Sequence, residues 1–337
     1  MSTSVDCGPP DQVQASLARN NNLMAPMTPP FEVVTLGEAM VEFNQTTPGE
    51  PNYLQGFGGD TSNAVIAAAR AGARTAYLTR VGDDSFGRAL LALWQGEGVD
   101  ATAVEVDADA PSGIYFVTHG AGGHEFSYRR AGSAASRMTP SWLDQAPANI
   151  IRSARILHVS GISMAISQTA CDTVLHAMRL ARVHGTLVSL DSNLRLKLWP
   201  LERARPAITE AIGLCDVFLP SLDDLIALAG ASDADALLDW CHAAGAPQVV
   251  LKLGADGAIA SDGRTRERIA AHHVVSTDAT GAGDCFCGNL LARIAQGEGL
   301  FAAARWANAA AAVAVQGFGA VAPLPRPAQV RALLCGD

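Results

Sequence analysis

Apolar and polar residues follow two alternating patterns along most of this chain. Short apolar runs predict buried strands at residues 31–38, 76–82, 156–159, 187–190, 216–219, 248–252, 257–260 and 272–275. Apolar residues at helical spacing predict helices at residues 64–71, 86–96, 168–184, 202–213, 222–228, 233–243, 284–296 and 301–316. This succession of strands and helices predicts an α/β fold: a doubly wound, mostly parallel sheet flanked by helices.

Residues 100–130 do not follow this succession of strands and helices. Apolar and polar residues alternate in 113–118 and again in 124–129, with a glycine turn at 120–123 between them. Such alternation predicts a hairpin whose two faces differ. Together with the strand-and-loop segment 39–57, it is expected to form a small antiparallel β-sheet that stands off the core as a lid.

The first 30 residues differ from the rest in composition. They contain Gly8-Pro9-Pro10, Asn20-Asn21-Asn22 and Pro29-Pro30, and they lack the basic-then-apolar layout of a signal peptide. We interpret residues 1–30 as a disordered tail in front of one domain that spans 31–337.

The net charge and the cysteine content argue against several classes of function. The 337 residues carry a net charge of −9, which gives no general attraction to nucleic acid or to an anionic membrane. No run of 18 apolar residues predicts a transmembrane helix. The seven cysteines show no zinc-site spacing, so reduced thiols and a cytoplasmic location are expected.

Residues 278–284 (DATGAGD) are the most informative stretch for chemistry. A glycine-rich turn that opens a helix leaves backbone N–H groups unpaired, and these favour an anion such as phosphate. Asp284 would repel a phosphate, but an acid there suits a base that takes a proton from an attacking hydroxyl. Alone, the stretch fits equally a tight turn whose acid stabilises the helix dipole.

Three further loops are expected beside this turn, because ligands of parallel sheets bind at the carboxyl ends of strands. They are residues 58–63, 190–195 and 251–257. Other nucleotide-binding folds are excluded, since the chain lacks a P-loop, a Gly-x-Gly-x-x-Gly after its first strand and the protein-kinase signatures. No His-Glu-x-x-His metal motif occurs either.

Two of these stretches resemble signatures of one family. Residues 278–284 resemble the C-terminal signature of the ribokinase-like (PfkB) carbohydrate kinases, and residues 58–64 (GGDTSNA) resemble their sugar-binding turn. Order and spacing fit from about residue 32 to about 330. The resemblance implies a ribokinase-like fold and ATP-dependent phosphorylation of a hydroxyl. Within the family, residues 191–199 and 128–134 most resemble 2-keto-3-deoxygluconate kinases.

The resemblance also implies roles for individual residues. Asp284 would be the base, and the amides of Gly281, Ala282 and Gly283 would form the anion hole. The sugar-acid pocket would be lined by Gly58, Gly59, Asn63, Tyr115, Tyr128, Arg130, Arg195 and Asp284. ATP would be bound by Asn193, Lys252, Gly254, Gly257, Gly281, Gly283 and Asn308.

Charge supports the two arginines, since a sugar acid bound to a protein of net charge −9 requires a guanidinium partner for its carboxylate. The expected cofactor is Mg²⁺ with ATP, with K⁺ as an open addition. No direct protein ligand to the metal is expected. Where the family often has Asn-x-x-Glu, this chain has residues 221–224 (SLDD), so Asp224 would act through a water molecule.

The expected function is therefore transfer of the γ-phosphate of ATP to the C6 hydroxyl of 2-keto-3-deoxygluconate. One alternative is a fructokinase or another neutral-sugar or nucleoside kinase of the same fold. The alternative from another class is an inactive sugar-binding regulator, against which the intact Asp284 argues. A homo-oligomer formed through the lid is the expected assembly.

Overall fold

A computed structural model describes residues 29–120 and 123–336 of the chain. The predicted disordered tail lies outside the described residues except for its last two prolines. The carbonyl oxygens of Pro29 and Pro30 accept hydrogen bonds from the guanidinium of Arg74, at 2.9 and 3.0 Å. These bonds fix the entry of the chain into its first strand.

A nine-stranded sheet forms the centre of the described chain, in the order β15-β14-β13-β12-β11-β10-β1-β4-β6. All neighbours pair in parallel from β13 to β6, whereas β14 and β15 add antiparallel pairs at one edge. The strands are β1 (Phe31–Leu36), β4 (Thr75–Leu78), β6 (Val99–Asp100), β10 (Ala154–Ser160), β11 (Leu187–Asp191), β12 (Val217–Phe218), β13 (Gln248–Lys252), β14 (Ala258–Ser261) and β15 (Arg266–Ile269). The predicted doubly wound, mostly parallel sheet is confirmed.

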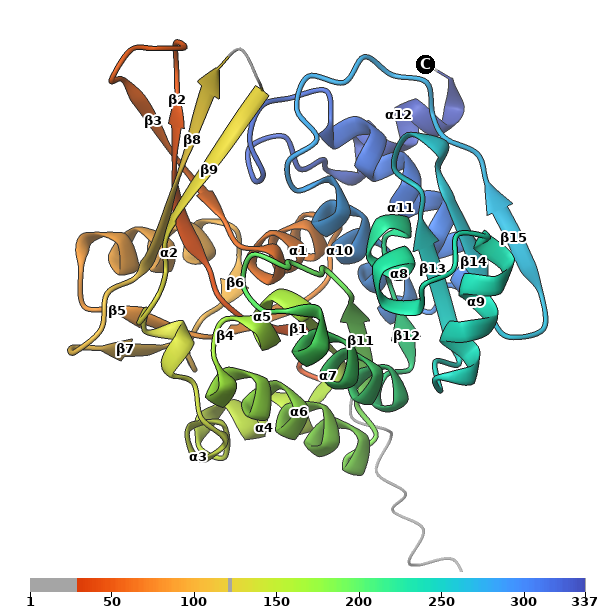
Figure 1. The fold of residues 1–337 in the computed structure, drawn as a ribbon, viewed down its shortest axis with the longest axis horizontal. Coiled ribbons are helices and arrows are strands. Elements are labelled where there is room, and N and C mark those ends of the chain that lie inside the picture. The colour runs from red at the N-terminus through yellow and green to blue at the C-terminus, as the bar shows by residue number, and fades with distance from the viewer. Residues whose placement is uncertain (1–28, 121–122, 337) are drawn as a thin grey trace, which may run out of the picture.

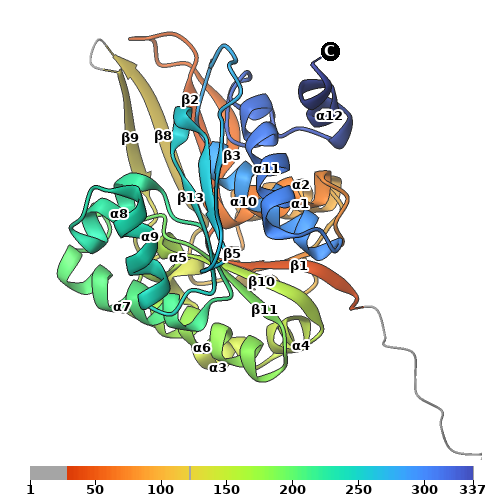
Figure 2. The same ribbon diagram turned by 90° about the vertical axis from the view of Figure 1, so that its right-hand side faces the viewer.

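Helices cover both faces of this sheet, which is why its central strands are largely apolar (Figures 1 and 2). One face packs against α3 (Pro140–Leu143), α4 (Ala146–Arg152), α5 (Gly161–Ala165), α6 (Gln168–Val183), α7 (Leu201–Leu214), α8 (Leu222–Ala229) and α9 (Ala234–Ala243). On the opposite side lie α1 (Asp60–Arg70), α2 (Ser85–Gly96), α10 (Ala282–Ala295), α11 (Leu300–Ala314) and α12 (Pro327–Cys335).

Helices α1 and α10 lie against each other at unusually short range, because both present small residues. A Cβ on Gly288 of α10 would lie 2.2 Å from the carbonyl oxygen of Ala64 and 2.7 Å from the Cβ of Ala67 on α1. Only glycine fits at this contact. The close approach brings the N-terminal ends of the two helices together, and both ends carry predicted site residues.

A four-stranded sheet stands off the core, as predicted, at the upper left of Figure 1. It consists of β3 (Tyr53–Gly58), β2 (Met40–Gln45), β8 (Gly113–Gly120) and β9 (Gly123–Arg129), in that order. The two outer pairs are antiparallel hairpins, and the central pair β2–β8 is parallel. We call it the small sheet.

The predicted extent of the lid needs one correction: of residues 100–130, only those from Gly113 onward join the small sheet. Strand β6 pairs with β4 of the main sheet, and Val99 is buried there. Strand β7 (Glu105–Asp107) pairs with β5 (Arg80–Gly82) in a separate two-stranded sheet. Burial of Val99 and then of Ala103 keeps this part of the chain against the core.

Two strand predictions were also inaccurate. The strand expected at 272–275 is wrong: the chain there has no regular structure, and Val275 is 84% exposed. The nearby strand is β15, whose Ile269 is buried. The single strand expected at 76–82 divides into β4 and β5. No helix in residues 29–120 and 123–336 has the length and apolar character needed to cross a membrane.

Candidate active site

Four loops and the small sheet meet at one end of the main sheet. The carboxyl ends of β11 and β13 lead into residues 192–195 and 253–257, and the N-terminal ends of α1 and α10 carry residues 58–63 and 278–284. Hydrogen bonds between their side chains join these segments directly. The prediction that the loops converge is therefore borne out by the geometry.

Asp284 lies in the first turn of α10 and is bonded to Asn63 in the first turn of α1. The Nδ2 of Asn63 donates a hydrogen bond of 2.8 Å to Oδ2 of Asp284. Asn63 is 3% exposed, so its amide is fixed by the packing of α1 against α10. This bond engages one of the two carboxylate oxygens of Asp284 and fixes the orientation of the carboxylate.

The turn before Asp284 requires glycine. Gly281 is the N-cap of α10 with φ +74°, and a Cβ there would lie 3.0 Å from the backbone of Ala320. Asp278 braces the turn: its Oδ1 accepts from the amide of Thr280 at 2.9 Å and its Oδ2 from that of Gly319 at 3.0 Å. The amide of Ala282 donates to the carbonyl oxygen of Ala279 at 3.2 Å, so the turn itself uses one of the three predicted anion-hole amides.

The environment of Asp284 makes it a stronger base than an ordinary carboxylate. Burial, followed by the nearby carboxylates Asp60 and Asp191, raises the pKa of Asp284 to about 7. The hydrogen bond from Asn63 and the charge of Lys252 act in the opposite direction. A carboxylate that gains its proton near neutral pH is suited to accept one from a substrate.

Lys252 lies at the end of β13 and forms an ion pair with Asp191 at the end of β11, at 2.8 Å. The Sγ of Cys287 on α10 lies 3.4 Å from Asp191 Oδ2 and 3.6 Å from Lys252 Nζ. Burial alone would lower the pKa of Lys252, but the charge of Asp191, its hydrogen bond to the ammonium and the nearby Cys287 and Asp284 together outweigh burial and raise the pKa, so the ammonium stays charged. Its Nζ is 3.6 Å from where a Cβ on Gly283 would stand, which puts the charge beside the glycine turn.

The other residues predicted to bind ATP are spread around this turn. Gly254 and Gly257 lie in the connection from β13 to β14, with φ +61° and +87°, and a Cβ on Gly257 would lie 2.1 Å from the Ile269 carbonyl oxygen. Asn308 on α11 donates to the carbonyl oxygen of Ala270 at 2.9 Å. Asn193 bonds to Asp60 at 2.9 Å. Both asparagine amides therefore have partners within the protein.

The small sheet supplies an aromatic wall. Tyr115 and Tyr128 are directly opposite on β8 and β9, with ring centroids 5.6 Å apart. The Tyr115 hydroxyl donates to Glu42 Oε2 at 2.6 Å, and a Cβ on Gly58 would lie 2.3 Å from that hydroxyl oxygen. Gly59 has φ +107°, and a Cβ there would lie 2.4 Å from the carbonyl oxygen of Glu38. These contacts bring Gly58, Gly59, Tyr115 and Tyr128 to one place, as predicted.

The two predicted arginines differ sharply, which corrects the picture of a two-arginine clamp. Arg130 forms a buried ion pair with Glu38, whose other oxygen accepts from the Ser133 hydroxyl. Arg195 is exposed and donates to the carbonyl oxygen of Leu194 at 2.9 Å. Within residues 29–120 and 123–336, no carboxylate forms an ion pair with Arg195. Of the two predicted arginines, Arg195 is therefore the one whose guanidinium has no counter-ion among the described residues.

Three acids at this site, Glu38, Glu42 and Asp60, were not among the predicted site residues. All three are buried, at 1%, 3% and 8% exposure. The only sequence signal for them was position: Glu38 and Glu42 closely follow the first strand, and Asp60 lies inside the 58–63 turn. Their partners are far away in the sequence, so no local pattern could reveal the pairing.

Asp224, the expected water-mediated metal contact, is bound within the protein. Its Oδ2 accepts from the Ser192 hydroxyl at 2.6 Å and from the Leu194 amide at 3.1 Å. These bonds tie the loop after β11 to the start of α8. In the part of the chain that the structure describes, no group of three or more His, Cys, Asp or Glu side chains is placed to hold a metal ion.

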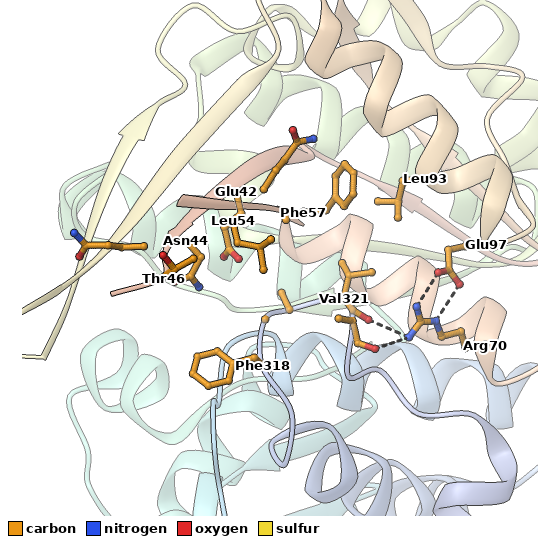
Figure 3. Close-up of a pocket in the computed structure, with 16 residues that line it drawn as sticks. Glu42, Asn44, Thr46, Leu54, Phe57, Arg70, Leu93, Glu97, Phe318 and Val321 are labelled. Carbon is orange, nitrogen blue, oxygen red and sulfur yellow. Dashed lines mark hydrogen bonds and ion pairs between the residues drawn. The ribbon is translucent and has the colours of Figure 1, made fainter. Parts of the chain in front are cut away.

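A cavity of about 550 Å³ opens on the far side of this region, between the small sheet and residues 318–322 (Figure 3). Glu42, Leu54 and Phe318 line it, together with the ion pair of Arg70 and Glu97. Glu42 is the one acid of the site that lines this cavity; Asp284, Asp60, Asp191 and Glu38 do not. The cavity therefore adjoins the candidate site through Glu42 and does not include Asp284.

The topology, the glycine turn of α10 and the acid bonded across to α1 define an α/β phosphotransferase. A family model described as pfkB family carbohydrate kinase matches residues 31–327, and the chain belongs to that family. Its structural relatives are ribokinase-like kinases, which agrees with the predicted fold and with ATP binding.

Individual relatives cover almost the whole chain. A 2-dehydro-3-deoxygluconokinase of Thermoproteus tenax is 36% identical over 314 residues, covering 90% of this chain and 94% of the relative. Fructokinase-2 of Solanum habrochaites is 31% identical over 320 residues, covering 90% and 96%. A crystal structure of fructokinase from Vibrio cholerae O395, in a form with fructose, ADP and a calcium ion bound, is 29% identical with a TM-score of 0.81, covering 90% and 98%.

Proposed function

We propose that this carbohydrate kinase phosphorylates the C6 hydroxyl of 2-keto-3-deoxygluconate, using Mg²⁺ and ATP. The observation that carries the proposal is the exposed guanidinium of Arg195, which follows the loop of Asp191 and Asn193 at the candidate site. A sugar acid offers a carboxylate for such a group, and a neutral sugar does not. The 36% identity to the Thermoproteus tenax kinase supports the same substrate.

In the proposed reaction, the C6 oxygen attacks the γ-phosphorus of ATP while Asp284 accepts the hydroxyl proton, and ADP leaves. Asn63 holds one oxygen of Asp284, so the other is directed to the hydroxyl. Backbone amides at Gly281 and Gly283, with the N-terminus of α10, stabilise the charge on the transferred group. Lys252 supplies a cation beside that turn. Removing one such donor commonly costs about 10²–10³ in rate.

The cation Mg²⁺ would arrive with the phosphates of ATP, whose negative charge it neutralises. The donor set fits this arrangement, since the acids at the site are either bonded within the protein or, like Asp284, reserved for the proton. A water-mediated contact from Asp224 and a requirement for K⁺ both stay predictions.

The second candidate is a neutral-sugar kinase such as a fructokinase, and one observation favours it. The buried pair of Arg130 with Glu38 removes one of the two guanidinium groups expected to bind a carboxylate. The fructokinase relatives, at 31–33% identity, are almost as similar as the sugar-acid kinase. An inactive regulator is disfavoured, because a non-catalytic protein has no need to hold Asp284 with a raised pKa.

A coupled assay of ADP release over a small panel separates these candidates. The panel comprises 2-keto-3-deoxygluconate, its galacto epimer, fructose, ribose and adenosine, with Asp284→Asn as the matched inactive control. We expect the highest kcat/KM for 2-keto-3-deoxygluconate. A higher value for fructose would reject the sugar-acid assignment, and no turnover on any sugar would favour the regulator.

Assembly and location are part of the same proposal. The small sheet exposes Tyr53, Leu54, Phe126 and Tyr128, with exposures of 38 to 68%. Apolar side chains on an exposed sheet commonly pair with a second copy or close over a ligand. We therefore keep the homo-oligomer through the small sheet, its action as a lid and a cytoplasmic location as predictions.

A further inference from the structure

Asp60 is a buried acid for which the proposed reaction has no task. It is the first residue of α1 and is 8% exposed. Its Oδ1 accepts from the amide of Thr61 at 2.8 Å, and its Oδ2 accepts from Nδ2 of Asn193 at 2.9 Å. Because both oxygens are bonded and shielded, Asp60 is poorly placed to contact a substrate itself.

The partner of Asp60 has a strained backbone. Asn193 has φ +29° and is the only residue other than glycine with a positive φ in the described part of the chain. Such a conformation costs about 1–3 kcal/mol and persists only where the surroundings enforce it. The bond to Asp60 and a 3.3 Å bond from the Asn193 amide to Asp191 supply that enforcement. Arg195 follows two residues later.

The two acids nearest Asp284 differ in their counter-ions: Arg130, whose charge acts on Asp60, is itself paired with Glu38. Lys252 is paired with Asp191, whereas Asp60 has only neutral partners within hydrogen-bond distance. Burial and the charge of Asp191 raise the pKa of Asp60, and Asp60 in turn raises that of Asp284. The titratable groups that face Asp284 are Asp60 on α1, Tyr115 on β8, Asp191 on β11, Lys252 on β13, and Cys285 and Cys287 on α10.

We propose that Asp60 is a positioning residue with two tasks: it holds the strained Asn193 turn that presents Arg195, and its negative charge makes Asp284 a stronger base. The two tasks link recognition of the sugar to proton transfer through one side chain. This inference rests on the proposed role of Asp284 as base, and it goes beyond that role because both oxygens of Asp60 are bonded within the protein.

The alternative is a purely structural role, in which Asp60 only stabilises the start of α1, where an acid is favourable in any helix. That role predicts a loss of stability and no change in the pH dependence of the reaction. A titration shift is therefore the observation that separates the two explanations.

The first test is Asp60→Asn, which keeps the shape and can still accept one hydrogen bond. We expect the acid limb of the kcat profile to move down by about one pH unit, because a like charge is removed beside Asp284. We expect kcat on its plateau to fall about tenfold, because a weaker base takes the proton less readily. The KM for ATP should stay unchanged. An unshifted acid limb with intact thermal unfolding would overturn the charge task.

The second test is Asn193→Gly, with Asn193→Ala beside it. Glycine tolerates a positive φ but cannot bond to Asp60, so it removes the link without adding strain. We expect Asn193→Gly to raise the KM for the sugar about tenfold while the acid limb of the kcat profile stays in place. Asn193→Ala should raise this KM further, because alanine at a positive φ keeps the backbone strain. An unchanged sugar KM in the glycine variant would overturn the positioning task.

Failure of the inference and failure of the proposed function give different results. If Asp284→Asn keeps wild-type turnover, Asp284 is not the base and the proposed mechanism fails. If Asp284→Asn is inactive while Asp60→Asn and Asn193→Gly behave as wild type, the mechanism stands and the inference is wrong.

Discussion

The side chain of Asn63 donates a 2.8 Å hydrogen bond to Asp284, joining two residues that stand 221 positions apart in the chain. The bond depends on the close contact of α1 and α10, which Gly288 permits. It places the turn at residues 58–63 and the glycine turn at residues 278–284 within one hydrogen bond of each other. Each turn alone fits an ordinary helix start, but together they form a site where a hydroxyl and a phosphate can meet.

The variant Asp284→Asn should lose turnover by at least about 10³-fold, since general base catalysis contributes about 10²–10⁴. The amide of the variant can still accept the bond from Asn63, so the local structure should persist. The measurement is kcat at saturating substrates, with ATP binding followed by calorimetry. Loss of ATP binding together with turnover would contradict the assignment of Asp284 to proton transfer alone.

The wild-type rate should depend on pH in a defined direction. Burial and the neighbouring acids raise the pKa of Asp284 to about 7, so the carboxylate is protonated and inactive as a base below that pH. We expect kcat to fall about tenfold for each pH unit below 7 and to reach a plateau above it. Measuring kcat from pH 5.5 to 8.5 with both substrates saturating checks this, and a flat profile would contradict it.

The same raised pKa predicts an effect on stability. In the unfolded chain an aspartate titrates near 3.9, so ionising Asp284 disfavours the folded state as pH rises from about 4 to 7. Asp284→Asn removes this cost. We expect its free energy of unfolding to exceed that of wild type by about 1–2 kcal/mol at pH 8, after allowance for solvent screening, with the difference vanishing near pH 4. Urea unfolding at the two pH values measures it.

Much of the fold followed from periodicity, because a doubly wound sheet repeats a strong local pattern. Helices such as α6 and α11 carry buried apolar faces that any window of the sequence shows. What periodicity could not provide was strand partnership. Strand β6 is two residues long and joins the main sheet, where Val99 is buried. Residues 272–275 contain the β-branched pair Val274 and Val275 but form no strand. Both facts depend on tertiary contacts.

The candidate site, like the fold, has features that the sequence predicts and features that it does not. The glycine turns and the loops after β11 and β13 were predictable, since ligands of parallel sheets bind at those strand ends. The pairing of charges was not: Arg130 meets Glu38 across 92 positions, and Lys252 meets Asp191 across 61. The motif that predicted Arg130 as a carboxylate ligand contains no sign of the acid that neutralises it.

The different roles of Arg195 and Arg130 can be distinguished by mutation. Arg195→Ala should raise the KM for 2-keto-3-deoxygluconate about 10²-fold and that for fructose little, because only the sugar acid loses a charged partner. Arg130→Ala should instead destabilise the protein by about 3–5 kcal/mol, because it leaves Glu38 buried without its counter-ion. Steady-state kinetics with both sugars and thermal unfolding provide the two readouts.

The matched control is the double variant Arg130→Ala, Glu38→Gln, which removes the unpaired charge and should recover part of the lost stability. Equal effects of Arg195→Ala on both sugars would reject the carboxylate assignment. A stable Arg130→Ala protein with a selective loss for the sugar acid would show that Arg130 binds substrate after all.

The last prediction concerns Gly58, which leaves room for the Tyr115 hydroxyl. A Cβ at Gly58 would lie 2.3 Å from that oxygen, so Gly58→Ala must displace the ring and break its 2.6 Å bond to Glu42. We expect the sugar KM to rise at least about tenfold, while the KM for ATP is unchanged and thermal stability falls through the unpaired buried Glu42. The comparison is Tyr115→Phe, which loses the same bond without moving the ring.

Both changes act on one hydrogen bond. The double variant Gly58→Ala, Tyr115→Phe should therefore raise the sugar KM clearly less than the two single effects combined would predict. A control in the same sheet is Gly120→Ala, where a Cβ meets no atom within 4 Å and should leave both KM values as in wild type. Strict additivity in the double variant would mean that Gly58 acts through another neighbour. An unchanged sugar KM in Gly58→Ala would remove the Gly58–Tyr115 contact from the sugar pocket, leaving Tyr128 and Arg195 to form it.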